Sequence, residues 1–208
     1  MSITNLQNKI FTITNPKGID SAVNELRLLL GGLTWVSHPY HIAQRFRRMA
    51  SEKEGKTGVE QAKKLYVYPE MYVGKDDKMP YHRLTPDNDY TGMFFFMVGK
   101  GEIEYNPNEY NFINYPVSII FSVNLATVNK TKLKEYLFTQ ELIEEARRLL
   151  TSSSPNFLFT YKLLTETRDL QEVYREFILD DLEQYNRVPM QCFRIDLTLK
   201  LMEECIMG

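Results

Sequence analysis

The sequence has few of the residues and motifs that carry redox, covalent or phosphate chemistry. Its 208 residues include two cysteines, Cys192 and Cys205, which lie too far apart for a CxxC pair. This count and spacing argue against a secreted domain held by several disulfides and against a zinc ribbon. The phosphate-binding motifs GxxxxGK[ST] and GxGxxG and the GxSxG motif of serine hydrolases are also missing. We therefore expect a protein that is not an enzyme and uses no cofactor.

Long apolar runs and a strong net charge are absent as well. No stretch approaches the roughly 20 apolar residues that cross a bilayer, and the first fifteen residues lack the layout of a signal peptide. The net charge is −2, so the chain as a whole does not attract nucleic acid or an anionic membrane. These features predict a soluble protein made in the cytoplasm.

The composition is that of a globular protein. Hydrophobic residues make up 43% of the chain and charged residues 25%, which is enough for a buried core. The length fits one domain, and we find no internal repeat or low-complexity tract. We expect a single α+β domain over residues 20–208, with residues 1–19 as an N-terminal arm or an edge strand. Residues 51–58 are the best candidate for a flexible loop.

Three segments share the apolar spacing i, i+1, i+4, i+7, i+8, which forms one stripe on a helix. They are residues 22–30, 42–50 and 142–150. The first helix is expected to begin near Asp20 and to end at Gly31 and Gly32, where glycine accepts a left-handed conformation. The third is expected to begin after Thr139, and a fourth helix is expected from about Asp169 to Ile178.

Other segments have the period of two that is typical of strands. Residues 193–201 alternate apolar side chains with polar ones such as Arg194 and Asp196, which predicts a strand with one polar face. Residues 93–98 are apolar throughout, which predicts a strand covered on both faces. Further strands are expected at residues 9–13, 64–68, 117–123 and 157–164, and a hairpin turn at residues 99–101. Because strands follow one another without helices between them, we predict a mostly antiparallel sheet flanked by helices.

The three histidines and an acidic turn are the candidates for a metal site. His38 and His41 could share one side of a helix, with a third ligand from His82 or from the TPDND turn at residues 85–89. A zinc site needs three or four defined ligands, and Asp and Asn favour turns through hydrogen bonds to the backbone. We therefore expect surface or capping histidines and a structured turn. A metal-dependent hydrolase that uses these groups is the weakest alternative.

Charge is unevenly distributed along the chain. Residues 45–64 contain seven basic and three acidic side chains, a local net charge of +4, whereas residues 141–183 contain ten acids and five bases. A cationic segment can contact a phosphate backbone or the acidic face of a neighbouring subunit, although a solvated surface is the simpler interpretation. The candidate contact residues are Arg45, Arg47, Arg48, Lys53 and Lys56.

Tyrosines are concentrated between residues 66 and 115. A tyrosine combines apolar area with a hydroxyl group and so suits an interface, although it can equally cover the protein's own sheet. We predict that the loops at residues 73–91 and 106–114 contact neighbouring rings or subunits. The candidate contact residues in and beside these loops are Tyr72, Tyr81, Asp87, Asp89, Tyr90 and Tyr110.

Six phrases of the sequence carry a family resemblance. They are LLGGLTW (29–35), YPEMYVGKDD (68–77), LTPDND (84–89), FFFMVGKGEIEY (94–105), SIIFSVNL (118–125) and VPMQCFRIDLTLKL (188–201). Together they resemble neck or tail-terminator-type ring proteins of tailed bacteriophages that infect Bacteroides-type bacteria, including crAss-like phages. The resemblance covers about residues 22–205.

This resemblance implies a homo-oligomeric ring in the virion, between the portal and the tail tube, with DNA passing through its centre. Proteins of this kind pair a sheet with flanking helices and use extended loops to reach the next subunit. The chain is longer than a minimal terminator, and its first 19 residues have no counterpart in the family, so a terminator, an adaptor and another stacked ring all stay open. The alternative is a protein-binding adaptor unrelated to phages, which would use its sheet for strand addition.

Overall fold

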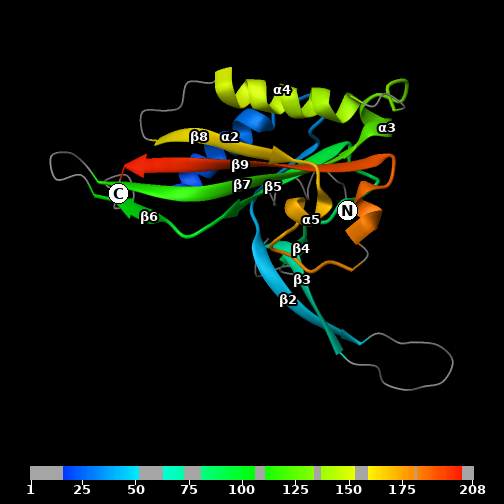
Figure 1. Ribbon diagram of the computed structural model, residues 1–208, viewed down its shortest axis with the longest axis horizontal. Helices are drawn as coiled ribbons and strands as arrows, with labels where there is room; N and C mark the ends of the chain where they lie inside the picture. Colours follow the sequence, from blue (N-terminus) through cyan, green and yellow to red (C-terminus); the bar gives the residue numbers. More distant parts are fainter. Residues whose placement is uncertain are drawn as a thin grey trace.

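The computed structural model describes residues 16–51, 63–72, 81–105, 111–133, 137–152, 159–180 and 182–202. Within these residues the chain forms a six-stranded sheet, a smaller three-stranded sheet and several helices (Figure 1). In chain order the elements are α2 (Ile19–Leu30), β1 (His38–Ile42), β2 (Gln44–Ser51), β3 (Lys63–Tyr72), β4 (Tyr81–Arg83), β5 (Gly92–Val98), β6 (Glu102–Glu104), β7 (Phe112–Asn124), α3 (Leu125–Val128), α4 (Phe138–Ser152), β8 (Phe159–Thr167), α5 (Leu170–Val173), η1 (Leu182–Asn186) and β9 (Met190–Met202). The predicted α+β class is confirmed. The predicted strand at residues 9–13 and residues 52–58 of the predicted loop lie outside the described residues.

The larger sheet is built around its two longest strands, β7 and β9. Its strand order is β1-β5-β7-β9-β8, and β6 also pairs with β7. The β7–β9 register is continuous over thirteen pairs, from Phe112 opposite Met202 to Asn124 opposite Met190. The β1–β5 pair is parallel and the other described pairs are antiparallel. The sheet is therefore mostly antiparallel, as predicted.

Helices α2 and α4 cover one face of this sheet (Figure 1). The apolar stripes predicted for both helices face inward, and Val23 of α2 and Ile143 of α4 are almost completely buried. The ring of Trp35 lies between the helices and the sheet, with centroids 5.8 Å from Phe121 and 6.2 Å from Phe193. Aromatic rings at these separations attract one another beyond the effect of the area they bury. This layer forms the larger part of the hydrophobic core.

Helix α2 ends where the sequence predicts, but not in the predicted way. Gly31 has a φ of −63°, which is right-handed, and its N–H donates to the carbonyl of Arg27 at 2.8 Å. The left-handed conformation expected of this glycine is therefore wrong. A Cβ atom at Gly31 would lie 3.0 Å from the Arg27 carbonyl oxygen and 3.4 Å from the ring of Pro39. The Arg27 carbonyl is the closer of these contacts, so a side chain at this position would crowd the last turn of α2.

The opposite face of the sheet is covered by α5, η1 and the smaller sheet. Phe95, Ile120 and Cys192 point to this side and pack with Tyr174 and Phe177. Strand β5 therefore buries side chains on both faces, as its apolar sequence predicts. The fourth predicted helix is shorter than expected, because α5 ends at Val173 and the following residues turn toward β3.

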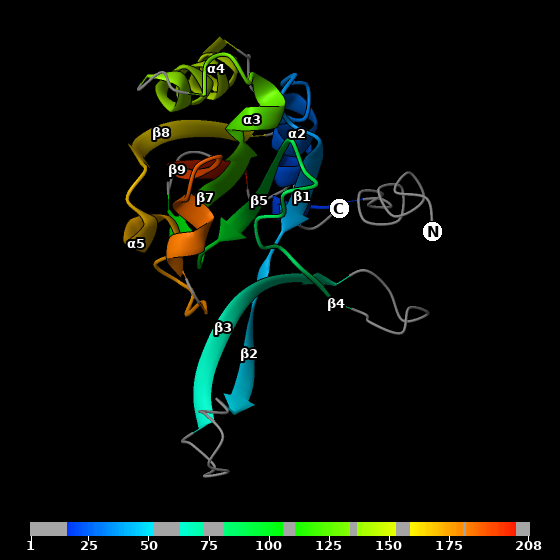
Figure 2. The ribbon, with the colours of Figure 1, turned by 90° about the vertical axis from the view of Figure 1, so that its right-hand side faces the viewer.

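The smaller sheet projects from the rest of the molecule (Figure 2). Its strand order is β2-β3-β4, with antiparallel pairing throughout. We call these three strands the hairpin arm and the remaining described residues the body. The helix predicted at residues 42–50 is wrong, since Ile42 ends β1, Ala43 joins the two strands and residues 44–50 belong to β2. Each residue of β2 pairs with β3, and this pairing outweighs an apolar spacing that also fits a helix.

The hairpin turn predicted at residues 99–101 is also wrong. Val98 and Glu102 do not pair with each other, because β5 and β6 both pair with β7, at Val117 and Asn114. The glycines are needed for a close approach to β7. A Cβ atom at Gly101 would lie 2.6 Å from the Tyr115 ring.

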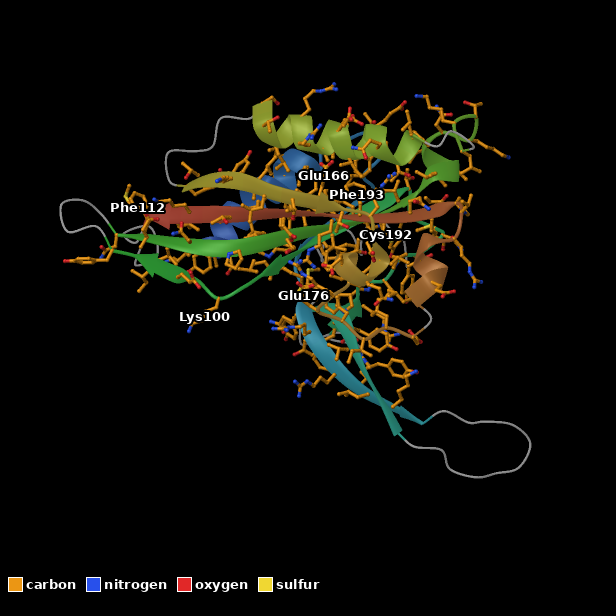
Figure 3. The ribbon with its side chains drawn as sticks, in the orientation of Figure 1. Lys100, Phe112, Glu166, Glu176, Cys192 and Phe193 are labelled. Carbon is orange, nitrogen blue, oxygen red and sulfur yellow. The ribbon has the colours of Figure 1, made fainter. Side chains whose placement is uncertain are left out.

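A buried arginine connects the larger sheet to the segment that supports the hairpin arm. Arg194 of β9 is 1% exposed. Its Nη1 and Nη2 donate to the two carboxylate oxygens of Glu176 at 2.6 and 2.7 Å, and its Nε donates to Asp196 at 2.7 Å. Nη2 also donates to the hydroxyl of Ser118 at 2.6 Å. The strand face predicted to be polar is thus covered here by the segment that carries Glu176, which Figure 3 labels between the sheet and β2.

The residues after Glu176 hold the hairpin arm in place. Ile178 and Val67 of β3 exchange two backbone hydrogen bonds, at 2.8 and 3.0 Å. Phe177 packs edge-on against Phe95, with the ring centroids 6.2 Å apart. A continuous series of contacts therefore runs from Arg194 in the central sheet to the base of the hairpin arm.

Replacement of Arg194 by methionine should lower the free energy of unfolding by about 3–5 kcal/mol, because Glu176 and Asp196 lose their buried cation. They keep only the exposed Arg175, at 3.3 and 3.4 Å. Denaturant unfolding would measure this loss. Arg168→Leu is the matched control, since Arg168 is exposed near the same segment and should change stability by no more than about 0.5 kcal/mol. Equal effects of the two substitutions would contradict the role assigned to Arg194.

The same network predicts loss of stability in acid. Burial alone would raise the pKa of Glu176 and Asp196, but hydrogen bonds and the charge of Arg194 hold both pKa values below their usual range. A lowered carboxylate pKa stabilises the fold above the unfolded pKa of about 4, and this contribution disappears as the pH falls through the folded pKa. Unfolding measured from neutral pH to about pH 3 should show this decline. Arg194→Met should show a smaller one.

Candidate assembly interface

Two exposed arginines lie side by side on the edge strand of the hairpin arm. Arg45 and Arg47 are two positions apart on β2, opposite Pro69 and Val67 of β3, so both point to the same face. Neither forms an ion pair with a described residue. They therefore present two uncompensated positive charges to solvent.

Arg48, the third arginine predicted to make external contacts, is already paired within the chain. Its Nε and Nη2 donate to the two carboxylate oxygens of Glu70 at 2.8 and 2.9 Å, and the Glu70 side chain is fully buried. The guanidinium of Arg83 lies 3.9 Å from the same carboxylate and 3.7 Å from the centroid of the Tyr68 ring. These contacts stiffen the face of the hairpin arm opposite to Arg45 and Arg47.

Several of the predicted contact tyrosines gather on this second face. The Tyr81 ring centroid lies 4.6 Å from that of Phe46 and 5.4 Å from that of Tyr72. Tyr72 is 45% exposed, whereas Tyr66 and Tyr68 are buried. The structure thus brings Tyr72 and Tyr81 together. Three further predicted contacts lie outside the described residues: Lys53, Lys56 and Tyr110.

The hairpin arm and the body carry opposite net charge. Among the described residues the hairpin arm has six basic side chains and one acidic side chain, a net charge of +5. The described body has thirteen basic and sixteen acidic side chains, a net charge of −3. Opposite charge on two separate parts of one surface favours contact between different parts of neighbouring molecules.

Histidines and tyrosines form a stacked cluster where the hairpin arm meets the body. The rings of His38 and Tyr90 stack at 3.8 Å between centroids, and those of Tyr40 and His82 at 5.5 Å. The Tyr40 hydroxyl lies 3.1 Å from Nε2 of His82. The expectation of surface or capping histidines is wrong for His38 and also for His41, which is buried and donates to the carbonyl of Asp20 at 3.2 Å.

Burial keeps these histidines neutral. It lowers the pKa of His38, His41 and His82, because a charged imidazole loses hydration inside the protein. The negative charge of Asp87 opposes the shift at His38 and His82. Burial also raises the pKa of the Tyr40 hydroxyl. The junction is therefore a packed, uncharged cluster near neutral pH.

Asp87 and Asp89 occupy an exposed turn beside this cluster. An Asp87 carboxylate oxygen accepts the backbone N–H of Asp89 at 3.0 Å, and the Asn124 side chain donates to the carbonyl of Asn88 at 3.2 Å. The predicted structured turn is thus confirmed. Neither carboxylate forms an ion pair with a described residue.

The described residues offer neither a metal-binding cluster nor an accessible thiol nucleophile. They contain no cluster of three or more His, Cys, Asp or Glu side chains with a suitable arrangement. Cys192 is completely buried, its thiol donates to the carbonyl of Tyr185 at 3.1 Å, and burial raises its pKa to about 11. The thiol is therefore neither exposed nor activated. No described helix combines the length and the apolar character needed to cross a membrane.

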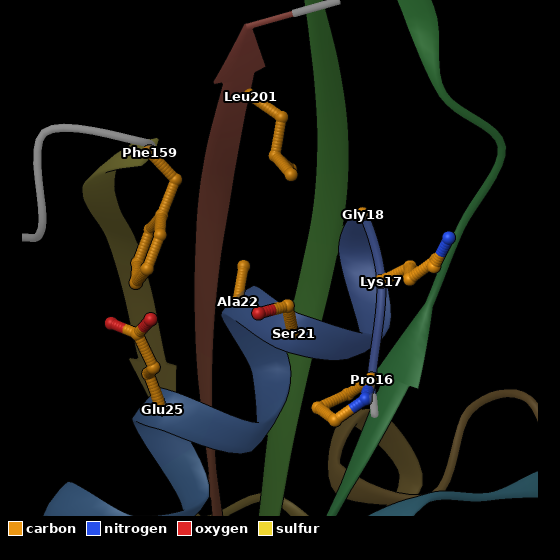
Figure 4. A pocket seen from close by; sticks show the side chains of 8 residues that line it. All are labelled: Pro16, Lys17, Gly18, Ser21, Ala22, Glu25, Phe159 and Leu201. Carbon is orange, nitrogen blue, oxygen red and sulfur yellow. The ribbon is translucent and has the colours of Figure 1, made fainter. Parts of the chain in front are cut away.

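The described surface contains small hollows. One of about 140 Å³ lies between the first turn of α2 and the ends of β8 and β9, where Phe159 and Leu201 form its apolar wall (Figure 4). Another of about 270 Å³ is lined in part by Pro86, Asn88 and Arg187. Both are smaller than the roughly 300–1,000 Å³ of typical small-molecule sites.

Comparison with known families and curated proteins gave no match. No protein-family model matches the chain, and no curated protein matches it significantly. Its surface chemistry is therefore the basis for a functional proposal.

Sequence reasoning missed the residues that organise the hairpin arm and its junction. The ion pair of Glu70 with Arg83 cannot be predicted from the sequence, because it depends on the register of β3 with β4. The stack of His38 on Tyr90 joins residues 52 positions apart. The alternation of Tyr66, Tyr68 and Glu70 is the one local signal that could have indicated a strand face built from aromatic and charged groups.

The buried histidines predict a stability change near neutral pH. A histidine whose folded pKa is lowered stabilises the protein fully above the unfolded pKa of about 6.5, and this contribution declines as the pH falls through that value. Thermal unfolding at about pH 7.5 and pH 5.5 should therefore show lower stability at the lower pH. His82→Gln should reduce the difference, whereas Asp87→Asn should enlarge it because Asp87 favours the protonated histidines. Unchanged differences in both variants would contradict this assignment.

Proposed function

We propose that this protein is a structural subunit of a tailed-bacteriophage virion. Copies of it would assemble into a ring in the neck or tail, in the manner of a tail terminator, around the DNA channel. The observation that carries the proposal is the positively charged hairpin arm, which projects from a negatively charged body. The phrases that resemble phage neck and tail proteins include residues of the hairpin arm, the Asp87–Asp89 turn and the central strands.

A closed ring needs two different, complementary surfaces on each subunit, so that one surface of each copy binds the other surface of the next copy. The hairpin arm supplies a surface that reaches beyond the body, since β2 extends about 27 Å at 3.3–3.4 Å per residue. Its pairing with β3 and its bridge to Ile178 give it a defined direction. The opposite charge of the body supports a receiving surface of the matching kind.

We further propose that the protein works without catalysis or a cofactor. Its partners would be copies of itself and the portal or ring proteins above and below it, with DNA passing through the centre without sequence-specific contacts. The protonated, inaccessible thiol of Cys192 and the uncharged histidine cluster support a structural rather than a catalytic role.

Assembly can be tested on the purified protein. Light scattering and negative-stain imaging, over a concentration range on the order of a hundredfold, should show conversion of monomers into one closed species of fixed mass. High salt should weaken this conversion, because exposed charge pairs are screened. A monomer throughout the range would contradict the proposal and favour a monomeric protein-binding adaptor.

A further inference from the structure

We infer that neighbouring copies hold each other through two pairs of opposite charges. Arg45 and Arg47 on the hairpin arm of one copy face Asp87 and Asp89 of the next copy. The inference rests on the proposed function, because it names the contact that would close the ring. The occupant of the cationic surface is therefore a second copy of this chain.

The cationic side is held in place by the sheet around it. Residues 44–51 pair along their whole length with β3, so the backbone that carries Arg45 and Arg47 is fixed. Both side chains are exposed and lack an ion pair among the described residues. Because the backbone is already fixed, only the side-chain rotamers of each arginine lose freedom when it meets a carboxylate. The guanidinium can form two parallel hydrogen bonds with that carboxylate.

The acidic side is equally well fixed. The Asp87 carboxylate closes its own turn, the N–H of Tyr90 donates to the Asp87 carbonyl at 3.2 Å, and the Tyr90 ring stacks on His38. The neighbouring cation, Arg187, shares a shallow hollow with Asn88 but forms no ion pair with either aspartate. Two carboxylates thus stand two positions apart, as the two arginines do.

Several other exposed carboxylates already have a partner within the chain. Examples are Glu141 with Lys132 at 2.7 Å, Glu104 with Lys200 at 2.9 Å and Glu172 with Arg175 at 3.5 Å. On α4, Glu145 accepts the indole N–H of Trp35 at 2.9 Å. A partner's arginines would have to displace these groups, whereas neither Asp87 nor Asp89 binds a side chain among the described residues.

The positions of the two pairs suit a head-to-tail contact. In the order β2-β3-β4, Arg45 and Arg47 lie on one edge strand, and the turn with Asp87 and Asp89 follows the strand at the other edge. Copies placed side by side would therefore bring one edge of each hairpin arm toward the opposite edge of the next. Such a heterologous contact repeats around a ring, whereas a two-fold contact would stop at a dimer.

Charge reversal and its compensation test this contact directly. The variant R45E/R47E and the variant D87K/D89K should each raise the concentration needed for assembly by about tenfold or more, since attraction becomes repulsion. The fourfold variant R45E/R47E/D87K/D89K has the same net charge as the wild type and should assemble again. A mixture of the two double variants should assemble less well than the fourfold variant. In the mixture only contacts between unlike variants are attractive, which is half of the possible contacts, whereas every contact of the fourfold variant is attractive.

Matched controls separate this contact from general charge effects. R147E/R148E reverses two exposed arginines on α4, and E141K/E144K reverses two exposed carboxylates on the same helix. Both should assemble as the wild type does. Circular dichroism and thermal unfolding of each variant would establish that its fold is retained.

The outcomes distinguish this contact from the proposed ring. Assembly of R45E/R47E at the wild-type concentration, or no recovery in the fourfold variant, would overturn the contact and leave the ring intact. A monomeric wild type would overturn both. If R45E/R47E assembles normally but is no longer retained by a double-stranded DNA fragment, the two arginines bind phosphate instead of a neighbouring copy.

Discussion

The interaction on which the rest of the structure depends is the buried ion network of Arg194. A guanidinium in the middle of a sheet is tolerated because two carboxylates, a hydroxyl and backbone carbonyls accept hydrogen bonds from its N–H groups. Its partner Glu176 lies directly before the residues that bridge to β3. The direction of the hairpin arm is therefore fixed by an interaction in the core of the body. The residues exposed on the hairpin arm owe their positions to it.

The fold could be predicted wherever local pattern and tertiary environment agree. Helices α2 and α4 carry a single apolar stripe and bury it, and β5 and β9 show the side-chain pattern of the faces they cover. Residues 42–50 fit a helical spacing equally well. Pairing of β2 with β3 decides their structure, and no local sequence pattern predicts that pairing. The helix expected beyond Val173 fails for the same reason, since Ile178 forms a bridge with a strand more than a hundred positions earlier.

The candidate interface was predictable in its charges but not in its geometry. The local excess of basic residues pointed to Arg45 and Arg47, and the TPDND turn pointed to Asp87 and Asp89. The internal pairing of Arg48 with Glu70 needs the strand register to be known. Likewise, the sequence placed His38 and His82 at the surface, because nothing near them shows that two tyrosine rings cover them.

Strand β1 leads into β2 through a single residue, Ala43, whose N–H donates to the Phe96 carbonyl of the larger sheet at 2.8 Å. The hairpin arm thus has no linker at this point, and its backbone is already ordered before any partner arrives. A partner that binds the hairpin arm would restrict few additional backbone dihedral angles, so the backbone conformational entropy lost on association should be small. Surfaces of modest area and charge can then support specific association, because little of their interaction energy is consumed in ordering the chain.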